Sequence, residues 1–307
     1  MNPTHPELQR LRCADLGRTT THQMAWWQWG DPHAAHAVVC VHGLSRQGRD
    51  FDVLARALLA RATQPLRIIC PDVAGRGESD WLSDPRNYQV PQYAADLLAL
   101  LAALHAQAPL RTLDWVGTSM GGLIGMAVAG QATMPLPAPV RRLVLNDVGP
   151  VVQWRAVERI AAYLGQPQRF ASVDAAADAL WAISSTFGPH TREQWLALCR
   201  PLLRPAPEGG LRFHYDPAIA LPLRGLTPQA AAAGEAAMWA LYDAISARTL
   251  LLRGAVSDLL SPETALAMTQ RGPQARCVEF AGIGHAPTLV ADDQVEVVCR
   301  FLLEPEA

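Results

Sequence analysis

The stretch Leu113-Asp-Trp-Val-Gly-Thr-Ser-Met-Gly-Gly-Leu-Ile-Gly-Met126 decides how this chain folds. It predicts a short apolar strand that turns sharply at Gly117-Thr-Ser-Met-Gly121 into a helix. Glycines flank Ser119 because a Cβ at those positions would strike the neighbouring strand or helix. We therefore expect Ser119 at the apex of the turn and at a helix N-terminus, where unpaired N–H groups and the helix dipole favour a developing negative charge.

Buried strands and helices alternate on both sides of this turn. A continuous apolar run, typical of a strand inside a parallel sheet, occurs at 37–41, and further largely apolar strands are expected at 66–70, 140–145, 249–253 and 275–280. Two leading strands are expected at 9–17 and 23–29, and helices at 51–59, 91–106 and 291–303. This rhythm predicts an α/β fold with a doubly wound, mostly parallel sheet of eight strands.

The rhythm stops after Pro150, and residues 151–247 have mostly helical patterns separated by proline- and glycine-rich joints. We expect a helical cap inserted after the sixth strand. The chain would then divide into a first core part at 1–150, the cap at 151–247 and a second core part at 248–307. Trp154 and Trp181 are candidates for lining an apolar substrate pocket under the cap, and helix-on-helix packing explains them equally well.

Composition excludes several classes of partner. The chain has 307 residues, 18% of them charged, and a formal net charge of −2, so no basic footprint for nucleic acid or an anionic membrane is present. No apolar run approaches the roughly 20 residues of a membrane span, and the first residues do not resemble a signal peptide. The six cysteines are scattered without metal-ligand spacing. We expect a cytoplasmic protein without a metal, as a monomer or homodimer.

Four candidates follow predicted strands, where catalytic groups of open α/β sheets gather: the His42-Gly43 loop, Ser119, Asp258 and His285. Ser119 needs a base to take its proton, and the base needs an acceptor to hold its tautomer. His285 lies on a glycine-rich loop and is the expected base. Asp258 is the expected acceptor, with Asp147 as its rival, because Asp147 also follows a strand. We interpret Asp147 as a hinge residue that binds backbone amides.

The acyl-transfer hypothesis also requires donors for the oxyanion. The backbone N–H groups of Leu44 and Met120 are the candidates, because they follow His42-Gly43 and Ser119 respectively. His42 is expected to brace its loop. Arg46 and Arg49 come just after that loop and are candidates for binding a substrate carboxylate, Arg46 in particular. The alternative interpretation is that they are ordinary surface arginines, which are common.

These motifs together resemble the α/β-hydrolase family over nearly the whole chain. The resemblance rests on the His42-Gly43 strand end, the glycine loop 72–79, Gly117–Gly122, Gly254-x-x-x-Asp258 and Gly284-His285, which occur in the family's order. Within the family, the chain is similar to capped bacterial esterases, enol-lactonases and carbon–carbon bond hydrolases. The resemblance implies an acyl-enzyme at Ser119, a small-molecule ester as substrate and no organic cofactor.

Two alternatives remain open at this point. A lactonase or a carbon–carbon bond hydrolase would use the same triad, although Thr118 departs from the asparagine common in the carbon–carbon hydrolases. A ligand-sensing protein would keep the fold and signal through its cap. A serine esterase is the preferred reading of the sequence.

Overall fold

Eight strands form one sheet in the computed structural model, which describes residues 5–305. The inference that no export signal is present rests partly on residues 1–4, which lie outside the described part. The strands lie in the order β1-β2-β4-β3-β5-β6-β9-β10, with antiparallel pairing of β1 with β2 and of β2 with β4 and parallel pairing elsewhere. Their bounds are Glu7–Ala14, Thr21–Gly30, Arg67–Asp72, His36–Val41, Thr112–Thr118, Val140–Asn146, Arg248–Gly254 and Arg276–Phe280 in that spatial order. The predicted eight-stranded, mostly parallel sheet is confirmed.

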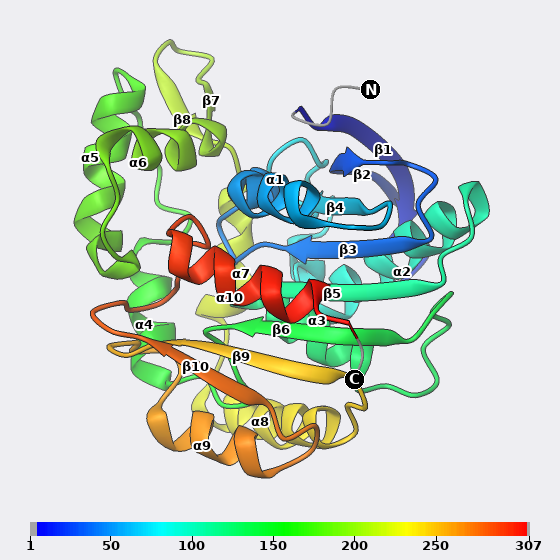
Figure 1. Cartoon of the computed structure of the whole chain (residues 1–307). Coiled ribbons are helices and arrows are strands. Elements are labelled where there is room, and N and C mark those ends of the chain that lie inside the picture. The colour runs from blue at the N-terminus through cyan, green and yellow to red at the C-terminus, as the bar shows by residue number, and fades with distance from the viewer. Residues whose placement is uncertain (1–4, 306–307) are drawn as a thin grey trace.

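Helices cover both faces of this sheet (Figure 1). Helices α1 (Asp52–Arg61) and α10 (Asp292–Leu303) cover one face, and α2 (Val90–Gln107) and α3 (Met120–Ala129) cover the other. The strand side chains alternate between the two layers: Val39 packs with the α2 and α3 side, whereas Val38 and Cys40 pack with the α1 and α10 side. Both faces of the inner strands are therefore buried, which explains why their sequences are apolar without alternation.

The chain between β6 and β9 is mostly helical, as predicted. It contains α4 (Trp154–Tyr163), α5 (Val173–Ser184), α6 (Arg192–Cys199), α7 (Ala220–Arg224) and α8 (Pro228–Asp243), and a small hairpin of β7 (Leu203–Pro205) and β8 (Leu211–Phe213). Helices α4 to α6 and the hairpin lie beyond the carboxyl ends of the central strands (Figure 1). Helix α8 packs against α3 instead, so the last part of this segment joins the helices on that side of the sheet. Helix α9 (Pro262–Gln270) follows β9.

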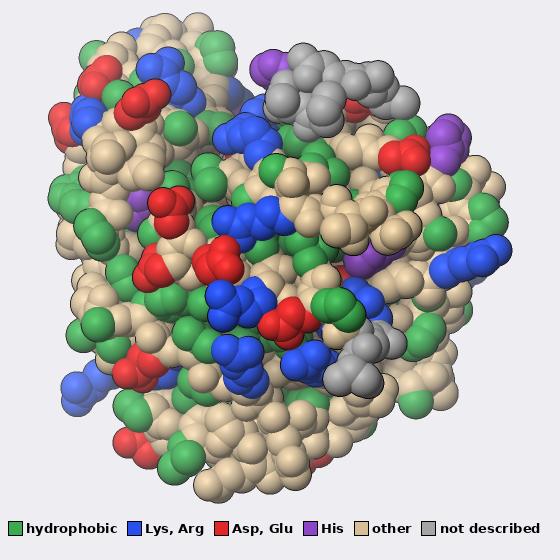
Figure 2. Space-filling view, in the orientation of Figure 1, with side chains coloured by type: hydrophobic (Ala, Val, Ile, Leu, Met, Phe, Trp, Pro, Cys, Tyr) green, Lys and Arg blue, Asp and Glu red, His purple; other side chains and the backbone are tan. Residues whose placement is uncertain are grey.

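Charged side chains of both signs are mixed over the face formed by α1 and α10 (Figure 2). Arg61 and Arg300 both pair with Glu296, and Arg49 pairs with Asp52. Neither sign forms an extended patch on this face, in keeping with the small net charge. Within residues 5–305, no helix combines the length and the apolar character needed to cross a membrane.

Candidate active site

Ser119 lies at a strained turn between β5 and α3. Its backbone has φ 52° and ψ −117°, in the region of positive φ that residues other than glycine rarely adopt. The flanking glycines make this turn possible, because a Cβ on Gly121 would lie 2.0 Å from the carbonyl oxygen of Val41, and one on Gly117 2.3 Å from that of Gly121. The turn therefore holds the Ser119 hydroxyl at the N-terminus of α3, as the sequence predicts.

His285 links Ser119 to a carboxylate. Its Nε2 lies 2.9 Å from Ser119 Oγ, and its Nδ1 lies 2.8 Å from Asp147 Oδ2. An ionised carboxylate only accepts hydrogen bonds, so Nδ1–H donates to Asp147 and Nε2 is left to accept the Ser119 hydroxyl proton. This is the tautomer that a general base at Ser119 requires.

Asp147 is fixed by three donors around its carboxylate. The N–H of Gly254 donates to Oδ1 at 2.9 Å, and the Ser257 hydroxyl donates to Oδ2 at 2.6 Å, the oxygen that also accepts from His285. The side chain is fully buried. Its backbone has φ 55°, a second strained position beside the strand ends. Such a carboxylate has one orientation available, which orients the imidazole in turn.

The expectation that Asp258 contacts His285 is wrong. Its carboxylate accepts two hydrogen bonds from the guanidinium of Arg159, at 2.6 and 2.9 Å, whereas the Nδ1 of His285 pairs with Asp147. The physical reason is the order of the strands. Asp147 directly follows β6, the immediate neighbour of the strand that carries Ser119, whereas Asp258 lies four residues beyond the end of β9, one strand further away.

The candidate oxyanion donors lie on either side of Ser119. Met120 is the first residue of α3, so its N–H has no acceptor within the helix. The loop of Leu44 passes close by, since a Cβ on Gly43 would be 3.6 Å from the Ser119 Cβ. Arg76, which the sequence gave no reason to select, contacts both residues that carry these donors: its Nε donates to the Leu44 carbonyl at 2.8 Å, and its Nη2 lies 3.7 Å from the Met120 sulfur.

His42 braces the same loop, as expected. Its Nδ1–H donates to the Gly43 carbonyl at 2.7 Å, and its Nε2 accepts the N–H of Val73 at 3.0 Å. The ring is completely buried, and this desolvation lowers the pKa of His42 to about 3. The imidazole is therefore neutral at ordinary pH and holds the loop after β3 against the end of β4.

A cavity of about 90 Å³ opens beside Ser119. Its walls come from the loop after β3, from α4 and α5, from α6 and from the His285 loop, and its apolar members include Ile160, Ile183, Phe187 and Leu198. The expectation that Trp154 and Trp181 line it is wrong. Trp181 packs edge-on against Trp195 inside the helical segment, with ring centroids 5.1 Å apart. Arg46 does reach the cavity, but Asp50 holds its guanidinium by two hydrogen bonds of 2.6 and 2.7 Å.

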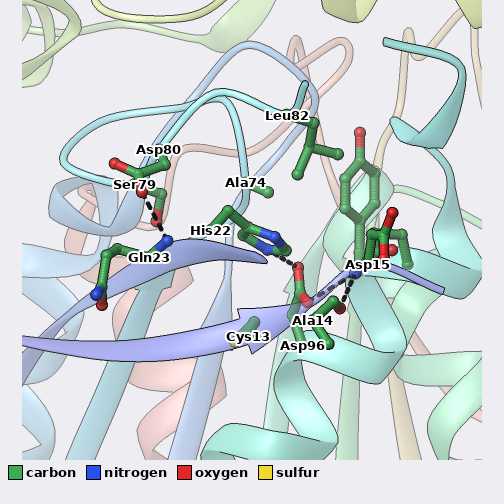
Figure 3. Close-up of polar contacts among 12 residues, drawn as sticks. Cys13, Ala14, Asp15, His22, Gln23, Ala74, Ser79, Asp80, Leu82 and Asp96 are labelled. Carbon is green, nitrogen blue, oxygen red and sulfur yellow. Dashed lines mark hydrogen bonds and ion pairs between the residues drawn. The ribbon is translucent and has the colours of Figure 1, made fainter. Parts of the chain in front are cut away.

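Cys13, His22 and Asp96 are the group within residues 5–305 whose ligand atoms lie close enough to hold a metal, all within 4.8 Å of one another. Figure 3 shows His22 on β2 pointing at Asp96 on α2. They are 2.9 Å apart at Nε2 and Oδ2, and Gln92 donates to the other carboxylate oxygen at 2.8 Å. Burial raises the pKa of the Cys13 thiol to about 12, so this sulfur carries its proton. We interpret the group as a polar link between the edge strands and α2.

Similarity to known proteins agrees with this geometry. Residues 36–292 match the α/β hydrolase fold family, and the chain belongs to that family. It is 47% identical to the 3-hydroxybutyrate-oligomer hydrolase of Cupriavidus necator over 300 residues, which cover 96% of this chain and 97% of that protein. The chain is thus a serine hydrolase that acts on carboxylic esters of small molecules.

Two solved structures match almost the whole chain. An α/β hydrolase from Novosphingobium aromaticivorans is 34% identical, with a TM-score of 0.80 and coverage of 97% of this chain and 98% of that one. A putative hydrolase from Rickettsia typhi has a TM-score of 0.84 at 24% identity and covers 98% of this chain and 100% of its own, which shows the shared fold alone.

Proposed function

We propose that Ser119, His285 and Asp147 form the catalytic triad and that the enzyme hydrolyses the ester bonds of 3-hydroxybutyrate oligomers. The observation that carries the triad is the continuous hydrogen-bonded path from Ser119 Oγ through His285 to Asp147. The likeness to the Cupriavidus necator oligomer hydrolase over almost the whole of both chains supports the substrate.

The reaction follows the roles that the side chains are placed to perform. Ser119 Oγ attacks the ester carbonyl while His285 Nε2 takes its proton, and the imidazolium is stabilised by Asp147. The N–H groups of Leu44 and Met120 receive the oxyanion. The tetrahedral intermediate collapses when the ester C–O bond breaks and His285 returns the proton to the departing alkoxide. Water, activated by the same imidazole, then hydrolyses the acyl-enzyme and releases Ser119.

The chemistry of the cavity suits such a substrate. A 3-hydroxybutyrate unit carries a methyl branch and a short methylene segment beside each ester, and Ile160, Ile183, Phe187 and Leu198 offer apolar surface of that scale. The cavity is far below the roughly 300 Å³ at which typical ligand sites begin, which favours short units over long acyl chains.

Three further expectations accompany this proposal. The division into a core at 1–150 and 248–307 with a cap at 151–247 stays a prediction. Helix α8 lies within the predicted cap range but packs against α3 of the core. The cytoplasmic location stays a prediction that cell fractionation would test. Analytical ultracentrifugation would distinguish the two expected oligomeric states, monomer and homodimer.

The proposal is tested with the linear dimer and trimer of 3-hydroxybutyrate, by quantifying the released monomer chromatographically. Wild type should release monomer from both, and Ser119→Ala should lower the rate by at least about 10³-fold, because no other nucleophile is oriented by His285. Ser184→Ala removes another hydroxyl that lines the same cavity and should retain most of the activity. Absence of monomer release by wild type, or equal losses in both variants, would contradict the proposal.

A further inference from the structure

Arg159 differs from the other permanently charged residues of the catalytic cavity in where its partner lies. Among the described residues that line it, the permanently charged ones are Arg46, Asp50 and Arg159. Arg46 and Asp50 neutralise each other through two short hydrogen bonds, and both side chains are mostly buried. Arg159 on α4 is therefore the charged residue of this lining whose ion-pair partner, Asp258, lies outside the lining, and it shares the cavity with Ser119.

The ion pair between Arg159 and Asp258 is partly exposed to solvent. Asp258, which does not line the cavity, pairs with the guanidinium from outside, and the two side chains are 41% and 47% exposed. Ion pairs at this exposure contribute little, because water and salt screen them. A carboxylate that enters from the cavity side can thus compete with Asp258 for the guanidinium.

Tyr163 strengthens this side of the cavity as an anion site. It lies one turn after Arg159 on α4, interacts with the guanidinium and also lines the cavity. Burial raises the pKa of Tyr163, so the phenol keeps its proton and remains a hydrogen-bond donor. A guanidinium and a phenol O–H together form a donor pair that suits a carboxylate.

We propose that Arg159 binds the free carboxylate of the substrate and so selects the ester bond that reaches Ser119. This inference rests on the proposed function, because a linear 3-hydroxybutyrate oligomer ends in one carboxylate. Arg159 and Ser119 line the same cavity of about 90 Å³, and the proposal places a single unit between the bound carboxylate and the cleaved ester. Ser119 Oγ then bonds to the acyl carbon, the ester C–O bond breaks, and the terminal unit leaves as 3-hydroxybutyrate after its alkoxide takes the proton from His285. Asp258 holds Arg159 in place until the substrate arrives.

The test compares the 3-hydroxybutyrate dimer with its N-methylamide, in which the carboxylate is blocked and the internal ester is intact. Wild type should show a KM at least about tenfold lower for the free acid, which is the scale of one hydrogen-bonded charge pair. Arg159→Gln should remove most of this difference, and Arg159→Lys, which keeps the charge, should retain part of it. Arg155→Gln is the matched control, because Arg155 is exposed one turn earlier on the same helix and does not line the cavity.

Equal KM values for acid and amide in wild type would overturn the assignment, as would an equal effect of Arg155→Gln and Arg159→Gln. Hydrolysis of both dimers with equal KM would still leave the proposed function standing. If neither dimer is hydrolysed, the proposed function fails. Carboxylate binding by Arg159 is then tested separately, through inhibition of p-nitrophenyl acetate hydrolysis. Butyrate should then inhibit at least about tenfold more strongly than butyramide, and this preference should be lost in Arg159→Gln.

Discussion

Arg76 contacts both residues that carry the proposed oxyanion donors, through the carbonyl of Leu44 and the side-chain sulfur of Met120. Its Nε donates to the Leu44 carbonyl. Its Nη1 donates to the Ala74 carbonyl at 2.7 Å and to the Tyr93 hydroxyl at 2.8 Å. The planar fork of arginine satisfies these acceptors at fixed angles, which a lysine ammonium does not reproduce. We therefore regard Arg76 as a positioning residue for the loop that carries the Leu44 N–H.

Arg76→Lys should lower kcat by about tenfold or more with little change in KM, because removal of an oxyanion donor costs about 10²- to 10³-fold and a displaced donor costs less. Steady-state kinetics on p-nitrophenyl acetate measures this. Arg67→Lys is a matched control, since Arg67 is also fully buried and donates to three backbone carbonyls at the opposite end of β4. If both variants lose kcat equally, the effect belongs to general loosening of the fold.

At the scale of secondary-structure elements, the neutral imidazole of His42 links the end of β3 to the end of β4. His42 accepts the N–H of Val73, one residue past β4, while its own loop carries Leu44. Asp72 at the end of β4 is also fully buried, and desolvation raises its pKa to about 7. These two groups act on stability with opposite signs. Asp72 holds a proton in the folded state that the unfolded chain loses near pH 4, so its contribution falls as pH rises towards 7.

His42 makes the fold lose stability as pH falls. Between about pH 3 and 6.5 the unfolded chain protonates this imidazole and the folded protein does not, so the contribution of His42 to the free energy of unfolding decreases by about 1.4 kcal/mol per pH unit on acidification. Urea unfolding of wild type and His42→Gln from pH 7.5 to 4.5 isolates this slope, because Asp72 contributes to both proteins. The stability advantage of wild type should shrink below pH 6.5. A difference that is independent of pH would show that His42 does not stay neutral in the folded protein.

The sequence predicted most of the sheet, because strands buried on both faces are largely apolar and end at glycine or polar residues. It also predicted Ser119 and the His285 loop, where glycine spacing reports a local backbone requirement. It did not reveal β7, whose three residues, Leu203–Pro205, are too few for a pattern and end in proline. These successes depend on local structure that neighbouring residues determine.

At the scale of the whole molecule, strand order and long-range contacts determine the site residues that the sequence did not predict. The choice between Asp147 and Asp258 depends on the lateral order of β5, β6 and β9, which no local pattern encodes. Arg76 and Arg159 act through contacts with residues 32 and 99 positions away in the chain. Trp181 was a candidate for the cavity wall, yet Ile183 and Ser184 at the end of α5 line the cavity instead. Tertiary packing alone selects among side chains that a sequence presents as equivalent.

The most direct measurement is kcat on p-nitrophenyl acetate, a neutral ester, for Asp147→Asn and Asp258→Asn side by side. The proposed triad predicts that Asp147→Asn loses about 10³- to 10⁴-fold, because an amide at that position no longer holds the His285 tautomer. Asp258→Asn should keep most of the wild-type kcat, since its carboxylate contacts Arg159 and not the imidazole. A large loss in Asp258→Asn together with a nearly normal Asp147→Asn would contradict the triad and return Asp258 to the role first expected from the sequence.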